Sequence, residues 1–344
     1  MERGRARQHG TGLGAYRQCR ALAGPSEKET NRFGDGLMTT VAIIGLGTMG
    51  AGMAATIARA GMTVRAHDIK PEAIEKARDS LPIITRILDE LDMPNKGDGT
   101  AVAFADTVEE TVAGADMVIE NVPERLDLKL ELFRQLDRLV SSDCVLASDT
   151  SGIPITKLQQ AVSAPERVIG MHWSNPPHLI PMIEVIAGAH TSAETRDWLV
   201  KFIEGLSLRP VVVKQDVPGF VENRILYAIM REAVDLVERG VIEPEGLDTC
   251  VSWGIGYKLA IIGPMALLDM AGLDIYQSVG SYLNADLCTR DDVAGYVTDR
   301  TAEGKLGVKS GAGIFQYTPE EIERLRAERA RRFVAVRRAL EREP

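Results

Sequence analysis

A histidine and a glutamate in neighbouring predicted strands are the residues best suited to chemistry in this sequence. His172 ends the apolar run 168–172, and Glu184 lies within the next run, 182–186. A histidine with a pKa near neutrality can take a proton from a substrate hydroxyl, and open α/β sheets bind ligands at the carboxyl ends of their strands. Glu184 is suited to hold the second ring nitrogen. Taken alone, His172 is equally compatible with a structural role, so the prediction of a general base depends on the surrounding pattern.

The first element that would position this pair is the segment 41–52, VAIIGLGTMGAG. Its leading apolar residues predict a buried strand. The G-x-G-x-x-G that follows predicts a turn into a helix whose free N–H groups hold a pyrophosphate. Asp68 ends the next predicted strand, where a carboxylate can bind ribose hydroxyls, and Ile69 follows it in place of an arginine that would favour NADP. The alternative is a glycine-rich turn in an α/β domain that binds no nucleotide. The strand, glycine loop, helix and second strand together predict NAD as cofactor. The residues expected to bind it are Gly45, Gly47, Thr48, Met49, Gly50 and Asp68.

Apolar runs alternate with helical periodicities between residues 41 and 213. Strands are predicted at 41–44, 63–68, 101–105, 117–120, 144–148, 168–172, 182–186 and 210–213. Helices are predicted at 51–60, 71–91, 109–112, 126–139 and 193–205. This alternation predicts an α/β fold with a Rossmann-like, doubly wound parallel sheet.

Helical patterns alone follow residue 216. They lie at 220–238, 244–251, 264–271, 275–283, 293–303 and 319–341. We therefore predict a disordered N-terminal tail at 1–37, an NAD-binding domain at 38–216 and a mainly α-helical C-terminal domain at 217–344. The helical domain is expected to close the active site and to form the interface of a homodimer.

Composition narrows the class of partner. The net charge of −9 argues against a nucleic-acid partner and against a basic membrane-binding patch. No apolar run approaches the roughly 18 residues that a bilayer span needs. The four cysteines are widely spaced and form no C-x-x-C pair, so neither a zinc site nor a disulfide framework is predicted. We expect a cytoplasmic enzyme that acts on a small molecule and uses no metal.

Several motifs together resemble the 3-hydroxyacyl-CoA dehydrogenase family over residues 40 to 317. They are SDTS (148–151), HWSNP (172–176), PGFVENR (218–224), ENVPERLDLK (120–129) and KSGAG (309–313). The resemblance implies that His172 is the general base and that Glu184 is its partner. It also implies that Ser151 contacts the substrate oxygen and the cofactor, and that Asn223 completes the active site. The other residues that it places near NAD are Glu124, Lys129, Asn175 and Lys309. Otherwise Glu124 and Lys129 would form a surface pair, and Lys309 would be a solvated loop residue.

The second predicted helix departs from the members that use CoA, which carry a serine and a lysine against the coenzyme. Ile84 and Leu91 occupy those positions here, and Lys70 to Asp98 contains five basic and seven acidic residues, which would repel a polyphosphate. The strings MHWSNPPH (171–178) and CVSWGIGYK (250–258) are similar to a branch that oxidises a pyridine aldehyde in vitamin B6 degradation. That branch implies NAD-dependent oxidation of the aldehyde hydrate, together with its NADH-dependent reduction.

Three alternatives remain open at this point. The substrate would be a 3-hydroxyacyl-CoA in the first, and a small gulonate- or carnitine-type hydroxy acid in the second. In the third, the chain would be a structural NAD-binding protein without turnover, as lens crystallins of this lineage suggest. The joint presence of His172, Glu184, Ser151 and Asn223 argues against the third, because a structural role needs none of them.

Overall fold

The computed structural model describes residues 39–341, so the tail predicted at 1–37 lies outside the described residues. The strands are β1 (Thr40–Ile44), β2 (Thr63–His67), β3 (Val102–Phe104), β4 (Met117–Glu120), β5 (Val145–Ser148), β6 (Val168–Trp173), β7 (Met182–Ala187) and β8 (Arg209–Val213). The helices between them are α1 (Gly50–Arg59), α2 (Pro71–Glu90), α3 (Val108–Val112), α4 (Leu126–Leu139), α5 (Ile155–Leu158) and α6 (Ala193–Gly205).

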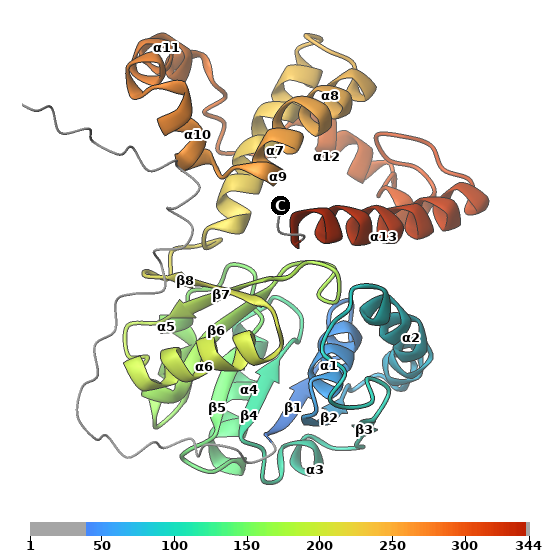
Figure 1. Cartoon of the computed structure of the whole chain (residues 1–344), viewed down its shortest axis with the longest axis vertical. Coiled ribbons are helices and arrows are strands. Elements are labelled where there is room, and N and C mark those ends of the chain that lie inside the picture. Colours follow the sequence, from blue (N-terminus) through green and yellow to red (C-terminus); the bar gives the residue numbers. More distant parts are fainter. Residues whose placement is uncertain (1–38, 342–344) are drawn as a thin grey trace, which may run out of the picture. The chain divides into compact units, whose positions relative to one another are not determined.

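All eight strands form one sheet in the order β3-β2-β1-β4-β5-β6-β7-β8 (Figure 1). The strand order reverses between β1 and β4, and a doubly wound sheet binds its dinucleotide in the crevice at such a switch point. The predicted Rossmann-like, doubly wound fold is confirmed. The carboxyl ends of β1, β4 and β5 therefore mark where the site must lie.

The last two strands run against the others. β7 pairs antiparallel with β6, and β8 pairs parallel with β7. A parallel return would need a crossover of about a dozen residues or more, and the connection 174–181 is too short for one. The predicted parallel, doubly wound sheet therefore holds for β1 to β6, and β7 and β8 extend it in the opposite direction. The reversal sets His172 directly opposite Glu184 in the strand register.

The core of the sheet region forms where strands pack against helices. Phe133 and Leu136, on one face of α4, are buried against Ala42 of β1 and Leu146 of β5. Every residue of α1 is buried, from Gly50 to Arg59. Because α1 begins directly at the glycine loop, this packing fixes the loop against the sheet.

The described residues beyond 216 are almost wholly helical. The elements are α7 (Glu222–Glu238), α8 (Pro244–Cys250), the π-helix η4 (Val251–Gly256), α9 (Tyr257–Ile261), α10 (Pro264–Ala271), α11 (Leu273–Asp286), α12 (Gly295–Ala302), η5 (Val308–Ser310) and α13 (Pro319–Glu341). Helical structure that begins at Pro244 continues through η4 to Ile261, so the helix predicted at 244–251 was too short. Gly254 and Gly256 weaken the helical signal in this part of the sequence.

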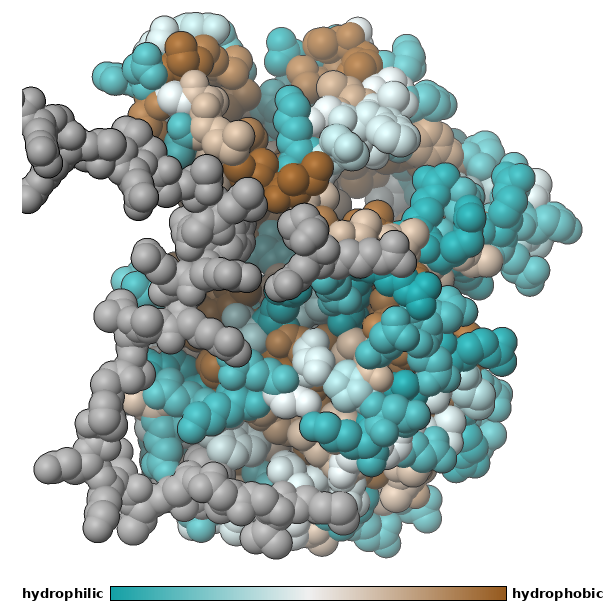
Figure 2. Space-filling model, in the orientation of Figure 1, coloured by the Kyte–Doolittle hydropathy of each residue, from teal (hydrophilic) through white to brown (hydrophobic). Residues whose placement is uncertain are grey.

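This helical region buries few apolar side chains. Among the described residues beyond 216, only Phe220, Ala294 and Val334 are fully buried apolar residues. Hydrophobic side chains instead gather on the surface over α10 and α11, drawn in brown in Figure 2. No single described helix is long and apolar enough to cross a bilayer. The segments Pro244–Ile261 and Pro264–Ala271 pass that test only as a pair, bent by 92°.

Candidate active site

The glycine loop after β1 has the shape that a pyrophosphate needs. Gly45 has φ +104°, and a β-carbon there would lie 2.4 Å from the carbonyl oxygen of Asn121, which follows β4. A β-carbon on Gly50 would lie 2.4 Å from the carbonyl oxygen of Gly45. A β-carbon on Gly47, in contrast, would meet nothing within 4 Å. Gly45 and Gly50 are therefore required by the fold, whereas Gly47 leaves open space beside the N-terminus of α1, where a phosphate can approach.

Asp68 lies at the carboxyl end of the neighbouring strand, β2. One carboxylate oxygen accepts the N–H of Leu46 at 2.8 Å, and the other accepts the N–H of Lys70 at 2.9 Å. These bonds hold the half-buried carboxylate beside the glycine loop, and each oxygen keeps a lone pair for a ribose hydroxyl. In the loop itself Thr48 is exposed, and Met49 occupies the N-cap position of α1 without a side-chain hydrogen bond to the helix. The residues present fit an adenosine diphosphate group.

His172 and Glu184 form a buried pair across β6 and β7. Nδ1 of His172 lies 2.8 Å from Glu184 Oε2, and the two side chains are 7% and 1% exposed. Oε1 of Glu184 accepts the backbone N–H groups of Val221 at 3.0 Å and Glu222 at 3.1 Å, at the start of α7. An acceptor at Nδ1 places the proton there, so Nε2 of the neutral ring carries the free lone pair that a general base needs.

Two opposing effects set the protonation of this pair. Burial lowers the pKa of His172, but the hydrogen bond to Glu184 and the charges of Asp149, Glu184 and Glu222 outweigh it, so the net pKa is raised. Burial raises the pKa of Glu184, but the hydrogen bonds from His172 and from the start of α7 lower it further than burial raises it. His172 is thus stabilised as an imidazolium beside a carboxylate that stays ionised.

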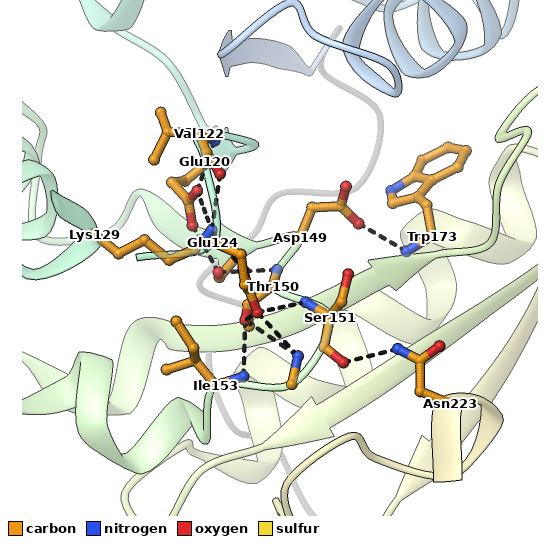
Figure 3. A network of polar contacts seen from close by, with 12 residues as sticks. Glu120, Val122, Glu124, Lys129, Asp149, Thr150, Ser151, Ile153, Trp173 and Asn223 are labelled. Carbon is orange, nitrogen blue, oxygen red and sulfur yellow. Dashed lines mark hydrogen bonds and ion pairs between the residues drawn. The ribbon is translucent and has the colours of Figure 1, made fainter. Parts of the chain in front are cut away.

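Glu124 organises the loop that carries Ser151 (Figure 3). Its Oε1 accepts the hydroxyl of Thr150 at 2.6 Å and the backbone N–H groups of Ser151 and Gly152, both at 3.1 Å. The Nδ2 amide of Asn223, on α7, donates to the carbonyl oxygen of Ser151 at 2.9 Å. Ser151 and Asn223 are therefore brought together, and both line a cavity of about 1060 Å³ that also contacts Glu124.

Lys129 lies behind Glu124 instead of on the surface. Its side chain is 1% exposed, and its ammonium group contacts Glu120 at 2.6 Å, the Val122 carbonyl at 3.2 Å and Glu124 at 3.4 Å (Figure 3). The alternative of a surface pair is therefore wrong for Lys129, because its buried ammonium group contacts the buried Glu120 as well as the exposed Glu124. In this arrangement Lys129 supports Glu124. Direct contact of Lys129 with NAD stays a prediction.

The remaining predicted residues lie apart from this network. Asn175 is exposed in the connection between β6 and β7, where the Asn175–Pro176 peptide is cis. Lys309 is exposed in η5 and, within the described residues, its side chain forms no hydrogen bond or ion pair. Contact of either residue with NAD stays a prediction.

Sequence reasoning missed Glu222 as a member of the site. Its backbone N–H binds Glu184, and its carboxylate accepts the hydroxyl of the buried Ser174. One ligand-capable atom from each of His172, Glu184 and Glu222 lies within 4.8 Å of the other two. The available signal was a carboxylate in the first turn of the helix predicted at 220–238, next to Asn223.

Known protein families match this chain between residues 40 and 317. The model of the 3-hydroxyacyl-CoA dehydrogenase NAD-binding domain matches residues 40–217, and the model of the C-terminal domain of the same family matches residues 219–317. A protein of Mesorhizobium japonicum named 5-formyl-3-hydroxy-2-methylpyridine 4-carboxylate 5-dehydrogenase is 62% identical over 307 residues, 89% of this chain and 99% of that protein. An L-carnitine dehydrogenase of Oceanobacillus iheyensis is 33% identical over 68% of this chain and 76% of its own length.

A crystal structure of a 5-formyl-3-hydroxy-2-methylpyridine 4-carboxylic acid 5-dehydrogenase, described as an NAD⁺-dependent dismutase, has a TM-score of 0.86. It is 61% identical and covers 90% of this chain and 100% of its own. The structure of FadB2 from M. tuberculosis has a TM-score of 0.67 and 28% identity, over 83% of this chain. The cofactor of this chain is NAD, as its glycine loop and Asp68 predict. The chain is a member of the 3-hydroxyacyl-CoA dehydrogenase family.

Proposed function

We propose that this protein oxidises 5-formyl-3-hydroxy-2-methylpyridine-4-carboxylate to the 4,5-dicarboxylate with NAD, and reduces the same aldehyde to 4-pyridoxate with NADH, in vitamin B6 degradation. The supporting observation is the buried His172–Glu184 pair in a chain that is 62% identical, over almost the full length of the relative, to a dehydrogenase of that name. A base whose partner is fixed by two backbone amides is built to move a proton repeatedly between the same two positions.

The oxidation requires a group that accepts a proton from the aldehyde hydrate. Water adds to the aldehyde to give a gem-diol, and Nε2 of His172 takes the proton of one hydroxyl. The bond from carbon to hydrogen then breaks, and the carbon becomes a carboxylic acid. When bound, NAD supplies the acceptor of that hydride. The Ser151 hydroxyl, and the Asn223 N–H that is not bonded to the Ser151 carbonyl, would stabilise the developing oxyanion.

A thiol mechanism finds no support among the described cysteines. Burial raises the pKa of Cys144 to about 12, so this thiol stays protonated. Cys250 and Cys288 are free thiols in α8 and in the segment after α11, within the helical region. Cys19 lies outside the described residues. The hydrate route through His172 needs no sulfur nucleophile, in contrast to a thioester route.

The α2 surface disfavours an acyl-CoA substrate. Ile84 is 7% exposed and Leu91 is 4% exposed, so both are core residues that cannot contact a coenzyme. The acidic excess between Lys70 and Asp98 would also repel the phosphates of CoA. A small anionic substrate avoids both obstacles.

The deciding experiment measures absorbance at the NADH band with purified protein, NAD and the pyridine aldehyde, in parallel with NADH and acetoacetyl-CoA. We expect rapid turnover of the aldehyde and formation of both the dicarboxylate and 4-pyridoxate. Turnover of the CoA thioester alone would overturn the proposed substrate.

We also propose that the chain works as a cytoplasmic homodimer, with an NAD-binding domain at 38–216 and a helical domain at 217–344 that closes the site and forms the dimer interface. The support is the helical region itself, where Trp253, Met265 and Met270 are each 74% exposed or more. Single chains rarely expose large contiguous apolar surfaces, and such surfaces mark interfaces. A second copy would cover these side chains.

A further inference from the structure

We propose that Glu222 is a positioning residue of the general base. Held by Ser174, it keeps a second carboxylate against His172, so the imidazole retains the proton that aldehyde oxidation releases and aldehyde reduction consumes. This inference rests on the function proposed above. It goes beyond that function because it assigns a separate group to the retention of the proton.

The tether of Glu222 is defined by two elements. Glu222 is the first residue of α7, and its backbone N–H donates to Glu184. Its side-chain Oε2 accepts the hydroxyl of Ser174, which is 3% exposed and follows directly after β6. A glutamate at the start of a helix would otherwise be free to turn toward water. The buried hydroxyl holds it within 4.8 Å of the base pair.

The groups around His172 are nearly all acidic. Asp149 approaches from the end of β5, Glu184 from β7 and Glu222 from α7, and the ring of Phe220 lies 5.8 Å away as an apolar neighbour. Burial raises the pKa of Asp149 to about 8, so this carboxyl is largely protonated near neutrality. Near neutrality Glu184 and Glu222 therefore supply the negative charge around His172, and Asp149 adds to it once it ionises above about pH 8. Among the described residues, Glu184 is the one that binds the ring directly.

A dismutation uses the proton on His172 in both of its half-reactions. In the oxidation, the hydrate loses one proton to His172 and one hydride from carbon. In the reduction, a second aldehyde gains one hydride at carbon and one proton at oxygen from His172. Two aldehydes and one water thus become one carboxylic acid and one alcohol, with no proton lost until the acid ionises. If His172 keeps its proton after the oxidation half-reaction, it can donate that proton in the reduction half-reaction that follows.

The first test measures the titration of His172 without cofactor or substrate. Histidine Cε1–H signals are followed by NMR from pH 5 to 10, and His172→Asn assigns the signal among the five histidines. In Glu222→Gln we expect the midpoint of His172 to fall by about 1 pH unit, because a nearby negative charge is lost while the backbone bond to Glu184 remains. Ser174→Ala should shift the midpoint in the same direction by less.

The matched control is Glu204→Gln, which makes the same chemical change on an exposed carboxylate of α6. It should leave the midpoint of His172 unchanged. A Glu222→Gln midpoint equal to that of wild type would overturn the proposal, and a Ser174→Ala midpoint equal to wild type would overturn the part assigned to Ser174. None of these readings depends on the identity of the substrate.

The second test compares the two half-reactions at pH 8. In Glu222→Gln the reduction should slow about five- to tenfold relative to the oxidation, because only the reduction needs the protonated ring. An equal loss in both directions would indicate a merely structural role and would overturn the proposal. If wild type turned over no pyridine aldehyde, the proposed function would fail, whereas the titration result would still report on the contact between Glu222 and His172.

Discussion

The sheet region and the helical region of this chain differ in how far their apolar residues are buried. In the sheet region, strand β4 is fully buried, strand β1 is buried except at Thr40, and helix α1 has every residue buried. In the helical region, none of the helices from α7 to α12 contains a fully buried residue. One region satisfies its hydrophobic surface within a single chain. The other leaves large apolar side chains exposed, which the proposed dimer would cover.

Residues from both regions meet at the active site. Glu184, from the sheet, accepts its backbone hydrogen bonds from Val221 and Glu222 at the start of α7. Asn223, also on α7, holds the Ser151 loop. The well-packed sheet therefore supplies the proposed base, His172, while the start of the helical region fixes its partner, Glu184. Four variants, ordered from the largest expected effect to the smallest, test this division.

His172→Asn should lower kcat for the aldehyde by about 10²- to 10⁴-fold, since a general base contributes that much. Binding of NADH, measured by fluorescence titration, should be unchanged because the glycine loop and Asp68 lie on other strands. A variant with wild-type kcat would show that the sheet region does not supply the base.

Lys129→Met should destabilise the sheet region by about 3–5 kcal/mol, because it leaves the buried Glu120 carboxylate without its cation. The measurement is urea unfolding followed by circular dichroism. The control, Arg239→Met, removes an exposed ion pair with Asp235 on α7 and should cost about 0.5 kcal/mol or less. Equal losses of unfolding free energy in the two variants would contradict the difference in packing between the sheet region and the helical region.

The double substitution Ile261→Asp and Met265→Asp should convert the proposed dimer to a monomer. Both side chains are exposed in the single chain, at 68% and 74%. Burying each would contribute about 1.5–3 kcal/mol, so their loss should weaken dimerisation at least about 100-fold. Sedimentation velocity gives the mass. Ile83→Asp, on the exposed face of α2, is the control that should leave the mass unchanged.

Asp149→Asn should stabilise the protein at alkaline pH. The folded carboxyl has a pKa of about 8 because of burial, whereas an unfolded aspartate ionises near 3.8. Folded protein therefore binds this proton more tightly, and its stability falls as pH rises from about 4 to about 8. Asparagine removes that loss and can still accept the Trp173 N–H. We expect Tm to rise by about 2–5 °C at pH 9 and little at pH 4. An equal rise at both values would exclude ionisation as the cause.

The sequence by itself determined those features of the protein that depend on residues close together in the chain. Gly45, Gly47 and Gly50 must follow a buried strand for a pyrophosphate to approach, and this pattern stands within a single stretch of chain. The order of the eight strands up to residue 213, and the position of His172 near a strand end, follow from periodicity for the same reason. The short helix α5 was not predicted, because four residues are too few to show a helical period.

Only the tertiary structure decided which distant groups meet. The antiparallel turn between β6 and β7 sets Glu184 opposite His172, and no periodicity encodes the direction of a strand. Glu222 reaches Ser174 across 48 positions, and Lys129 enters the core beneath Glu124 although its sequence pattern fits a surface equally well. Such contacts depend on how separate elements pack, because burial and neighbouring charge are properties of the folded chain.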